Sequence, residues 1–133
     1  MVVQDNIQQV QNIYGAFGRG DIAAVLDVLT DDIDWVIPGP SDLAITGARR
    51  GKSAVQEWFG ILAAHVSYQV FEPRQFIAQG EMVVVLVDTA GTALPTGRTY
   101  VNPEAHFFTF RGDKIARFQT FEDTAAVAAA FNG

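Results

Sequence analysis

Apolar side chains recur at helical spacing through the first half of the chain, which predicts three helices. The apolar face of the first helix consists of Ile7, Val10, Tyr14 and Phe17. Asp21 is placed to cap the second helix, and Ser53 and Gln56 have the spacing of a capping box that would open the third. Between these two helices we expect a short strand at 33–37, ended by prolines, and a loop at 41–52.

Polar and apolar side chains alternate through the second half, as they do in strands with one buried face. Turn signals separate the predicted strands 67–71, 74–79, 82–90, 98–110 and 114–121. The last two form a hairpin folded at Gly112-Asp113, and a short closing helix follows Asp123. This order predicts one α+β domain over residues 1–133, in which three helices pack on the concave face of a cone-shaped, curved, mixed or antiparallel sheet. Such a sheet leaves a cavity suited to a small molecule.

Composition narrows the range of partners. The 9 basic and 15 acidic residues give a net charge of −6, which disfavours a nucleic-acid partner. The absence of cysteine excludes disulfides and thiolate nucleophiles, and the two histidines lack metal-site spacing, so we expect no metal or cofactor. The apolar stretches are too short to span a bilayer, and the first residues lack the pattern of a secretory signal. We therefore expect a cytoplasmic protein with no membrane partner.

Three segments carry a resemblance to a known superfamily. They are "VQNIYGAFGRGDIAAVLDVLTDDIDWVIPGP", "GARRGKSAVQEWF" and "HFFTFRGDKIARFQTFEDT". Their order resembles the opening helices and first strand, the start of the third helix, and the final hairpin of nuclear-transport-factor-2-like proteins. SnoaL-like and ketosteroid-isomerase-related proteins are the most similar branch, over nearly the whole chain. The resemblance implies the cone-shaped fold, and a superfamily that includes isomerases, cyclases, epoxide hydrolases, dehydratases and non-catalytic binding modules.

The resemblance transfers only part of any known catalytic set. The tyrosine of ketosteroid isomerase corresponds to Tyr14, but its catalytic base falls at Ile37. The carboxylate of SnoaL-type cyclases falls at Thr120. In the relay of limonene epoxide hydrolase, one aspartate can match Asp88, but the arginine falls at Leu86. Steroid isomerisation and epoxide hydrolysis by those mechanisms are therefore disfavoured.

Strand alternation sorts the final hairpin into two faces. With a two-residue turn, Phe110 pairs with Ile115, and His106 then pairs with Gln119. The face expected to line the cavity carries Phe107, Phe118, Thr120 and Glu122. It is the more apolar face, and the resemblance also places it toward the cavity. A one-residue bulge would swap the faces and bring in His106 and Asp123 instead.

The other face of the hairpin is expected to form a subunit interface. It carries His106, Phe108, Phe110 and Phe121, and it is too apolar to be left in water. Members of the superfamily commonly pair through the outer face of the sheet. We therefore expect a homodimer through this face.

These placements define a candidate site. The candidate catalytic residues are Tyr14, Asp88, Glu122 and His106. The candidate substrate-binding residues are Phe17, Trp35, Ile37, Trp58, Leu86, Phe107, Phe118 and Thr120. Asp88 or Glu122, with its pKa raised by an apolar pocket, would be the general base, and Tyr14 would donate a hydrogen bond to developing negative charge.

The set indicates a cofactor-independent enzyme of the isomerase, lyase or polyketide-cyclase type that acts on a small hydrophobic substrate. The alternative is a non-catalytic module that holds a hydrophobic ligand in the same pocket. A general base should show a raised pKa, whereas a charge at the end of a strand should titrate normally.

Overall fold

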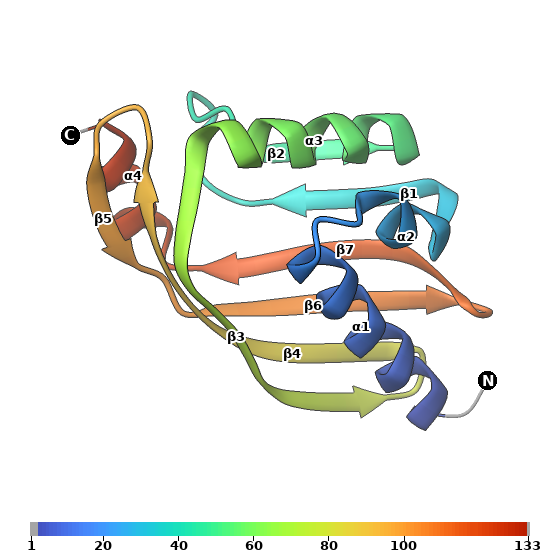
Figure 1. The fold of residues 1–133 in the computed structure, drawn as a ribbon. Helices are drawn as coiled ribbons and strands as arrows, with labels where there is room; N and C mark the ends of the chain where they lie inside the picture. Colours follow the sequence, from blue (N-terminus) through green and yellow to red (C-terminus); the bar gives the residue numbers. More distant parts are fainter. Residues whose placement is uncertain (1–2, 133) are drawn as a thin grey trace.

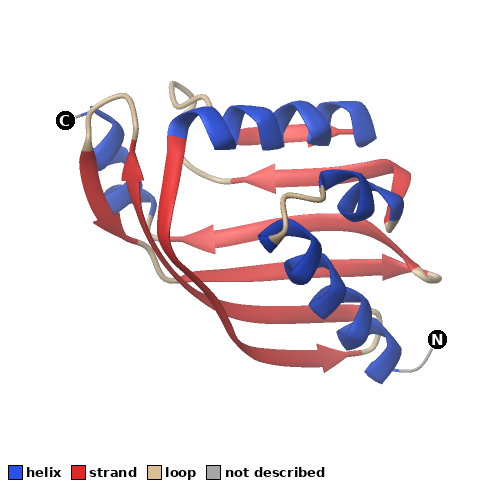
Figure 2. Ribbon diagram, viewed as in Figure 1, coloured by secondary structure: helices blue, strands red, loops and turns tan. Residues whose placement is uncertain are grey.

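Helices α1 (Val3–Gly18), α2 (Ile22–Asp27) and α3 (Lys52–His65) lie on one face of a strongly curved, open β-sheet (Figures 1 and 2). The computed structural model describes residues 3–132. The strands are β1 (Leu29–Ile37), β2 (Gly47–Arg50), β3 (Val66–Gln79), β4 (Met82–Ala93), β5 (Arg98–Val101), β6 (Glu104–Arg111) and β7 (Lys114–Glu122). Helix α4 (Thr124–Asn132) packs near β5 at the end of the chain.

The sheet has seven strands in the order β2-β1-β7-β6-β4-β3, and β5 pairs with β4. The β1–β7 pair is parallel and the other pairs are antiparallel. The predicted α+β class is confirmed, with a curved mixed sheet and helices mostly from the N-terminal half. Within residues 3–132, no helix is both long and apolar enough to span a bilayer.

Of the helices α2, α3 and α4, two begin at the capping residue indicated by the sequence. The carboxylate of Asp21 accepts a hydrogen bond from the backbone N–H of Ala24 and caps α2. Asp123 accepts one from the N–H of Ala126 in the same way at the start of α4. The capping box predicted for α3 is wrong, because Gly51 is the N-cap and makes no side-chain capping bond.

The strand boundaries differ from the prediction at three places. The segments 67–71 and 74–79 form one strand, β3, despite Pro73. Because β3 is the last strand of the sheet, the missing N–H of a proline is tolerated there, and nearby register shifts absorb the irregularity. The predicted strand 98–110 is two strands, β5 and β6, which are separated at Asn102-Pro103, and the predicted loop 41–52 contains β2.

A bulge in the β6–β7 hairpin decides which side chains face the helices. Pairing begins at Phe110 and Ile115, as predicted for a two-residue turn. One extra residue in β7, Ala116, then shifts the register, so that His106 pairs with Thr120 and not one residue earlier. The concave face of the hairpin consequently carries Glu104, His106, Phe108, Phe118, Thr120 and Glu122.

The predicted composition of the outer hairpin face is therefore wrong for three of its four residues. His106, Phe108 and Phe110 are buried, at 4%, 2% and 2% exposure. Phe121 does face outward and is 51% exposed. Phe107, which was expected in the cavity, packs edge-on against Phe121, with ring centroids 5.1 Å apart.

Candidate active site

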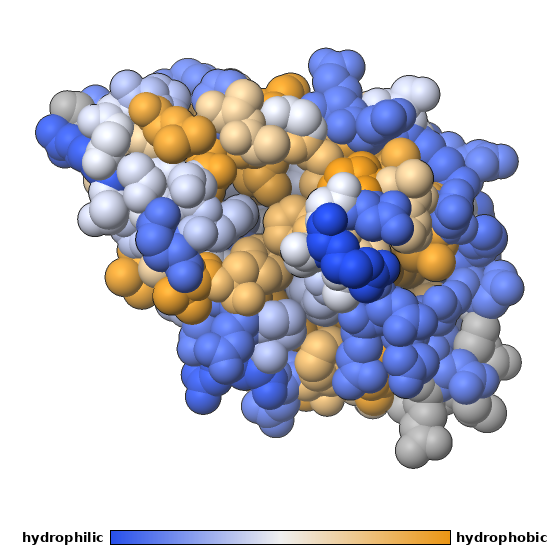
Figure 3. Space-filling view, in the orientation of Figure 1, coloured by the Kyte–Doolittle hydropathy of each residue, from blue (hydrophilic) through white to orange (hydrophobic). Residues whose placement is uncertain are grey.

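A cavity of about 70 Å³ lies between the helices and the concave face of the sheet. Apolar side chains gather around this hollow on the helical side of the molecule (Figure 3). Its walls are mostly aromatic. Its polar groups come from α1, from the ends of β6 and β7 and from Asn102 before β6, together with the hydroxyls of Tyr68 in β3 and Tyr100 in β5. The apolar faces of the helices turn toward the sheet, so their aromatic side chains line the space between the two layers. The cavity is therefore an aromatic pocket with polar groups concentrated on the sheet.

Most of the predicted site residues meet at this cavity. Its lining includes Tyr14, Phe17, Trp35, Ile37, Trp58, His106, Phe118, Thr120 and Glu122. Leu86, Asp88 and Phe107 are not part of it. In β4, Val83, Val85 and Val87 point inward, so the alternate positions 86 and 88 point outward.

The outward direction of Asp88 removes it as a candidate base for this cavity. Its carboxylate lies 3.4 Å from the guanidinium of Arg74, and its side chain is 48% exposed. Leu86 is 40% exposed on the same outer surface. The sequence pattern correctly placed the two residues on one face of β4, but it assigned that face to the wrong side.

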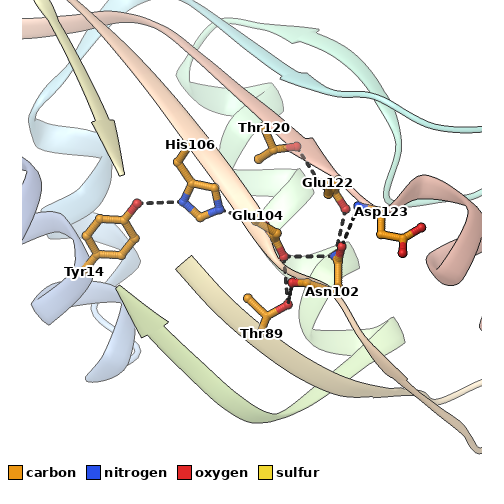
Figure 4. Close-up of polar contacts among 8 residues, drawn as sticks. All are labelled: Tyr14, Thr89, Asn102, Glu104, His106, Thr120, Glu122 and Asp123. Carbon is orange, nitrogen blue, oxygen red and sulfur yellow. Dashed lines mark hydrogen bonds and ion pairs between the residues drawn. The ribbon is translucent and has the colours of Figure 1, made fainter. Parts of the chain in front are cut away.

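A chain of three polar side chains forms one wall of the cavity (Figure 4). The hydroxyl of Tyr14 lies 2.7 Å from Nδ1 of His106. On the other side of the imidazole, Nε2 lies 2.8 Å from Oε1 of Glu104. The side chains of His106 and Glu104 are only 6% and 7% exposed. An ionised carboxylate can only accept, so Nε2 carries a proton in this arrangement, and Nδ1 of the neutral imidazole accepts the proton of Tyr14.

Glu104 is also held by the amide of Asn102, whose Nδ2 donates to Oε2 of Glu104 at 3.1 Å. The hydroxyl of Thr89 lies 3.1 Å from the same oxygen, but it lies closer, at 2.6 Å, to the backbone carbonyl of Asn102. The same amide lies 3.2 Å from Oε1 of Glu122, so Asn102 bridges the two carboxylates. Its carbonyl oxygen accepts from the backbone N–H of Asp123 at 2.9 Å, which fixes the amide orientation.

Glu122 and Tyr14 both favour their protonated forms. Burial, followed by the charge of Glu104, raises the pKa of Glu122, and hydrogen bonds from Thr120 and Asn102 only partly oppose the shift. Burial and the charge of Glu104 also raise the pKa of Tyr14 far above its ordinary value. The site therefore combines a carboxylate that accepts hydrogen bonds from His106 and Asn102, a second carboxylate that holds its proton to higher pH, and a neutral tyrosine.

Sequence reasoning missed two members of this network. Glu104 lies two residues before His106 in the same strand, so alternation places both side chains on one face, and that signal was available. Asn102 lies in the break between β5 and β6, and no spacing rule points to it. Figure 4 places it between Glu104 and Glu122, where only the folded chain brings it.

The fold and its cavity define a cone-shaped α+β protein with an acid/base cluster in an aromatic pocket. Residues 10–118 match the SnoaL-like domain family. An NTF2-like protein from Burkholderia xenovorans LB400 is 34% identical, with 99% of both chains covered and a TM-score of 0.91. The chain therefore belongs to the SnoaL-like family of the NTF2-like superfamily.

Two further solved structures are similar over almost their full length. An NTF2-like protein from Burkholderia pseudomallei K96243 is 29% identical, with 97% of this chain and 98% of that chain covered and a TM-score of 0.89. TerC, which was co-crystallised with polyporic acid, is 27% identical, with 97% and 99% covered and a TM-score of 0.86. No curated protein matches the chain.

Proposed function

We propose that the protein is a cofactor-independent acid/base enzyme of the isomerase, lyase or polyketide-cyclase type, acting on a small hydrophobic carbonyl compound. The observation that carries this proposal is the contact chain from Tyr14 through His106 to Glu104 at the wall of an aromatic cavity. Taking a carboxylate out of water costs several kcal/mol unless it is well compensated. A pocket that only holds an apolar ligand does not require a buried carboxylate. A site that transfers protons does require one, to stabilise the charge that forms.

The geometry assigns a direction to the proton transfer. Tyr14 donates a hydrogen bond to His106, so its oxygen can accept a proton from a carbon next to the substrate carbonyl as its own proton passes to the imidazole; His106 is the base and Tyr14 relays the proton. As that proton arrives, the original tyrosine proton moves to Nδ1 of His106. The resulting imidazolium lies against Glu104, whose charge stabilises it. This order differs from the role expected from sequence, in which Tyr14 would donate directly to the substrate.

Glu122 supplies the complementary acid. Its raised pKa keeps it protonated to higher pH than an ordinary glutamate, so it can donate to the carbonyl oxygen as negative charge develops there. The enol forms when the C–H proton reaches Tyr14 and the oxygen gains the proton of Glu122. Return of a proton to a different carbon completes an isomerisation, and attack of the enol on a second carbonyl completes a cyclisation.

The walls and one relative support an aromatic substrate. Trp35 stacks on Phe118 with ring centroids 4.1 Å apart, and Phe17 and Phe71 pack against each other at 5.0 Å on the side of the helices. Flat apolar surfaces of this kind suit a planar ring system. The 27%-identical TerC was co-crystallised with polyporic acid.

A second candidate function is passive binding of a hydrophobic ligand. Ile37 favours it, because this isoleucine lines the cavity at the place where the resemblance to ketosteroid isomerase puts a catalytic base. In this case the Tyr14–His106–Glu104 chain would only orient a polar group of the cargo.

Solvent deuterium exchange separates the two functions. Aryl ketones such as 1-tetralone and 2-tetralone, and hydroxynaphthoquinones, are incubated with the protein in D₂O, and incorporation is followed by NMR. Tyr14→Phe and Glu122→Gln should each slow exchange by about 10²–10⁴-fold. The matched control Asp88→Asn changes a carboxylate outside the cavity and should keep the wild-type rate. Compounds that bind without exchange above the buffer rate would instead support the passive module.

We also propose that the protein forms a homodimer through the outer face of the sheet. The aromatic side chain of Phe121 is 51% exposed, and Leu86 and Ile77 are 40% and 46% exposed. Leu86 and Phe121 lie in the same row across the sheet, because Leu86 in β4 pairs with Ala105 in β6, which in turn pairs with Phe121 in β7. Association would remove this apolar surface from water without closing the cavity, which opens toward the helices.

A further inference from the structure

The two tryptophans of the cavity differ in their hydrogen bonding. Nε1 of Trp58 donates to the backbone carbonyl of Ile45 at 2.9 Å. Nε1 of Trp35 is buried and has no hydrogen-bond partner among residues 3–132. Leaving a buried donor unpaired costs about 1–3 kcal/mol, and buried indole N–H groups usually have an acceptor. Trp35 is therefore an exception that needs an explanation.

The neighbours of Trp35 offer no acceptor in its immediate surroundings. Its ring packs on Phe118, Trp58 and Phe59, all of which are aromatic. Across β1, the next inward side chain is Ile37, which is also apolar. The rings that pack on Trp35 therefore carry no acceptor for the indole N–H, and an oxygen of a bound ligand would supply one.

One of the residues with an unpaired buried atom lines the cavity. Within the described part of the chain, three buried side-chain atoms lack partners: Asn6 Oδ1, Thr30 Oγ1 and Trp35 Nε1. Of their residues, only Trp35 lines the cavity. Asn6 and Thr30 lie elsewhere, so their unpaired atoms have no bearing on a ligand in this pocket.

Trp35 lies one aromatic ring away from the acid/base cluster. Phe118 pairs with Trp35 across β1 and β7, and the two rings stack. On its other side, Phe118 meets the imidazole of His106 edge-on, with centroids 5.3 Å apart. The ring of Phe118 thus lies between the indole of Trp35 and the Tyr14–His106–Glu104 chain.

We propose that Trp35 is a specificity-determining residue, whose Nε1 donates a hydrogen bond to a second oxygen of the substrate. This inference rests on the proposed function, which puts the first oxygen at the acid/base cluster. An indole N–H only donates, so the second group must be an acceptor such as a carbonyl. The substrate class is a planar aromatic compound with oxygen functions on two sides of its ring system, as in acylated naphthols and hydroxyquinones.

Matched ligands test the second oxygen. Dissociation constants are measured calorimetrically for 6- and 7-acetyl-2-naphthol and for the corresponding isopropyl-2-naphthols, which have similar shape but no acceptor. At least one acetyl compound should bind about 10-fold more tightly than its isopropyl partner. Polyporic acid is the reference ligand.

A matched pair of protein variants tests the donor. Replacement of Trp35 by β-(3-benzothienyl)alanine keeps the shape of the ring but exchanges N–H for sulfur, and should bring the acetyl-to-isopropyl ratio close to one. The same replacement at Trp58 is the control and should preserve the ratio, because that N–H already has a backbone acceptor. The chain has two tryptophans, so the Trp35 indole proton can also be followed by NMR, and it should shift on binding of the acetyl compound.

Each outcome bears on a different conclusion. An acetyl-to-isopropyl ratio near one in the wild type, or a ratio unchanged by the replacement at Trp35, overturns the role of Trp35. If either of these results is accompanied by deuterium exchange in a ketone with a single oxygen, the proposed enzyme stands without the role of Trp35. Failure of every naphthol and of polyporic acid to bind overturns the role of Trp35, whereas deuterium exchange in the tetralones decides separately whether the proposed enzyme stands.

Discussion

Removal of the Glu104 carboxylate is the sharpest test of the polar network. Glu104→Ala leaves Nε2 of His106 without the acceptor that it has at 2.8 Å. It also removes one of the two carboxylates that the amide of Asn102 reaches, whereas the hydroxyl of Thr89 keeps the backbone carbonyl of Asn102 as an acceptor at 2.6 Å. The carboxylate and imidazole are almost completely buried, so water replaces the lost acceptor only if it enters the space that the side chain leaves. The variant therefore converts a satisfied network into an unsatisfied one.

The expected loss follows from the buried pair. The imidazole of His106 is neutral in this arrangement, so Glu104→Ala breaks hydrogen bonds to a carboxylate and leaves no unpaired charge behind. A buried donor left unsatisfied costs about 1–3 kcal/mol, so we expect the free energy of unfolding to fall by about 1–3 kcal/mol. That is a large fraction of the roughly 5–15 kcal/mol available to a typical domain. Glu104→Gln keeps the shape and one acceptor oxygen, and should lose less.

Urea denaturation at a fixed protein concentration measures the effect. The matched control is Glu57→Ala, which removes an exposed glutamate from α3 and should stay within about 0.5 kcal/mol of wild type. A loss below about 1 kcal/mol for Glu104→Ala would refute the reasoning, because it would mean that the imidazole N–H of His106 readily finds another acceptor. An equal loss in the control would point to a general effect of the alanine substitution.

Three further predictions concern other parts of the chain. Folding raises the pKa of Glu122, so wild-type stability should decline as pH rises above about 4.3, the pKa of the unfolded state, and through the folded-state pKa. Glu122→Gln should flatten this part of the plot of urea midpoint against pH. Parallel plots for the variant and the wild type would contradict the prediction. Gly91→Ala places a Cβ 3.2 Å from the carbonyl oxygen of Ser67 and should destabilise by about 1–3 kcal/mol in thermal melts. Gly60→Ala, with open space in α3, should instead stabilise by about 0.5–1 kcal/mol. Phe121→Asp should shift sedimentation at micromolar concentration from dimer to monomer, and a monomeric wild type would end the dimer proposal.

Local patterns were sufficient for most of the helices and for the pairing of the final turn. Asp21 and the Gly112-Asp113 turn act through neighbours within a few residues, so their roles can be read from short segments. The capping box at the start of α3 failed because Gly51 adopts a positive φ of 90° and connects β2 directly to the helix. The Glu72-Pro73 turn signal failed because its effect depends on the strand lying at the edge of the sheet.

Alternation predicted which residues share a face but not which face is the inner one. Leu86 and Asp88 do share a face, yet the inner face of β4 belongs to the odd-numbered valines. The choice between two amphipathic faces depends on the strands and helices that pack on them. Both faces of β4 are apolar enough to be buried, so hydrophobicity alone did not decide between them.

The bulge at Ala116 is the single local feature that assembles the candidate site. Without the extra residue, His106 would lie opposite Gln119, and the carboxylates of Glu104 and Glu122 would point to opposite faces of the hairpin. With it, Glu104 pairs directly with Glu122, close enough for one amide of Asn102 to reach both. Two carboxylates this close in a buried site do not ionise equally well. Glu104 accepts the imidazole N–H, and its charge adds to the effect of burial in raising the pKa of Glu122. The division into a base side and an acid side thus follows from one inserted residue in a β-hairpin.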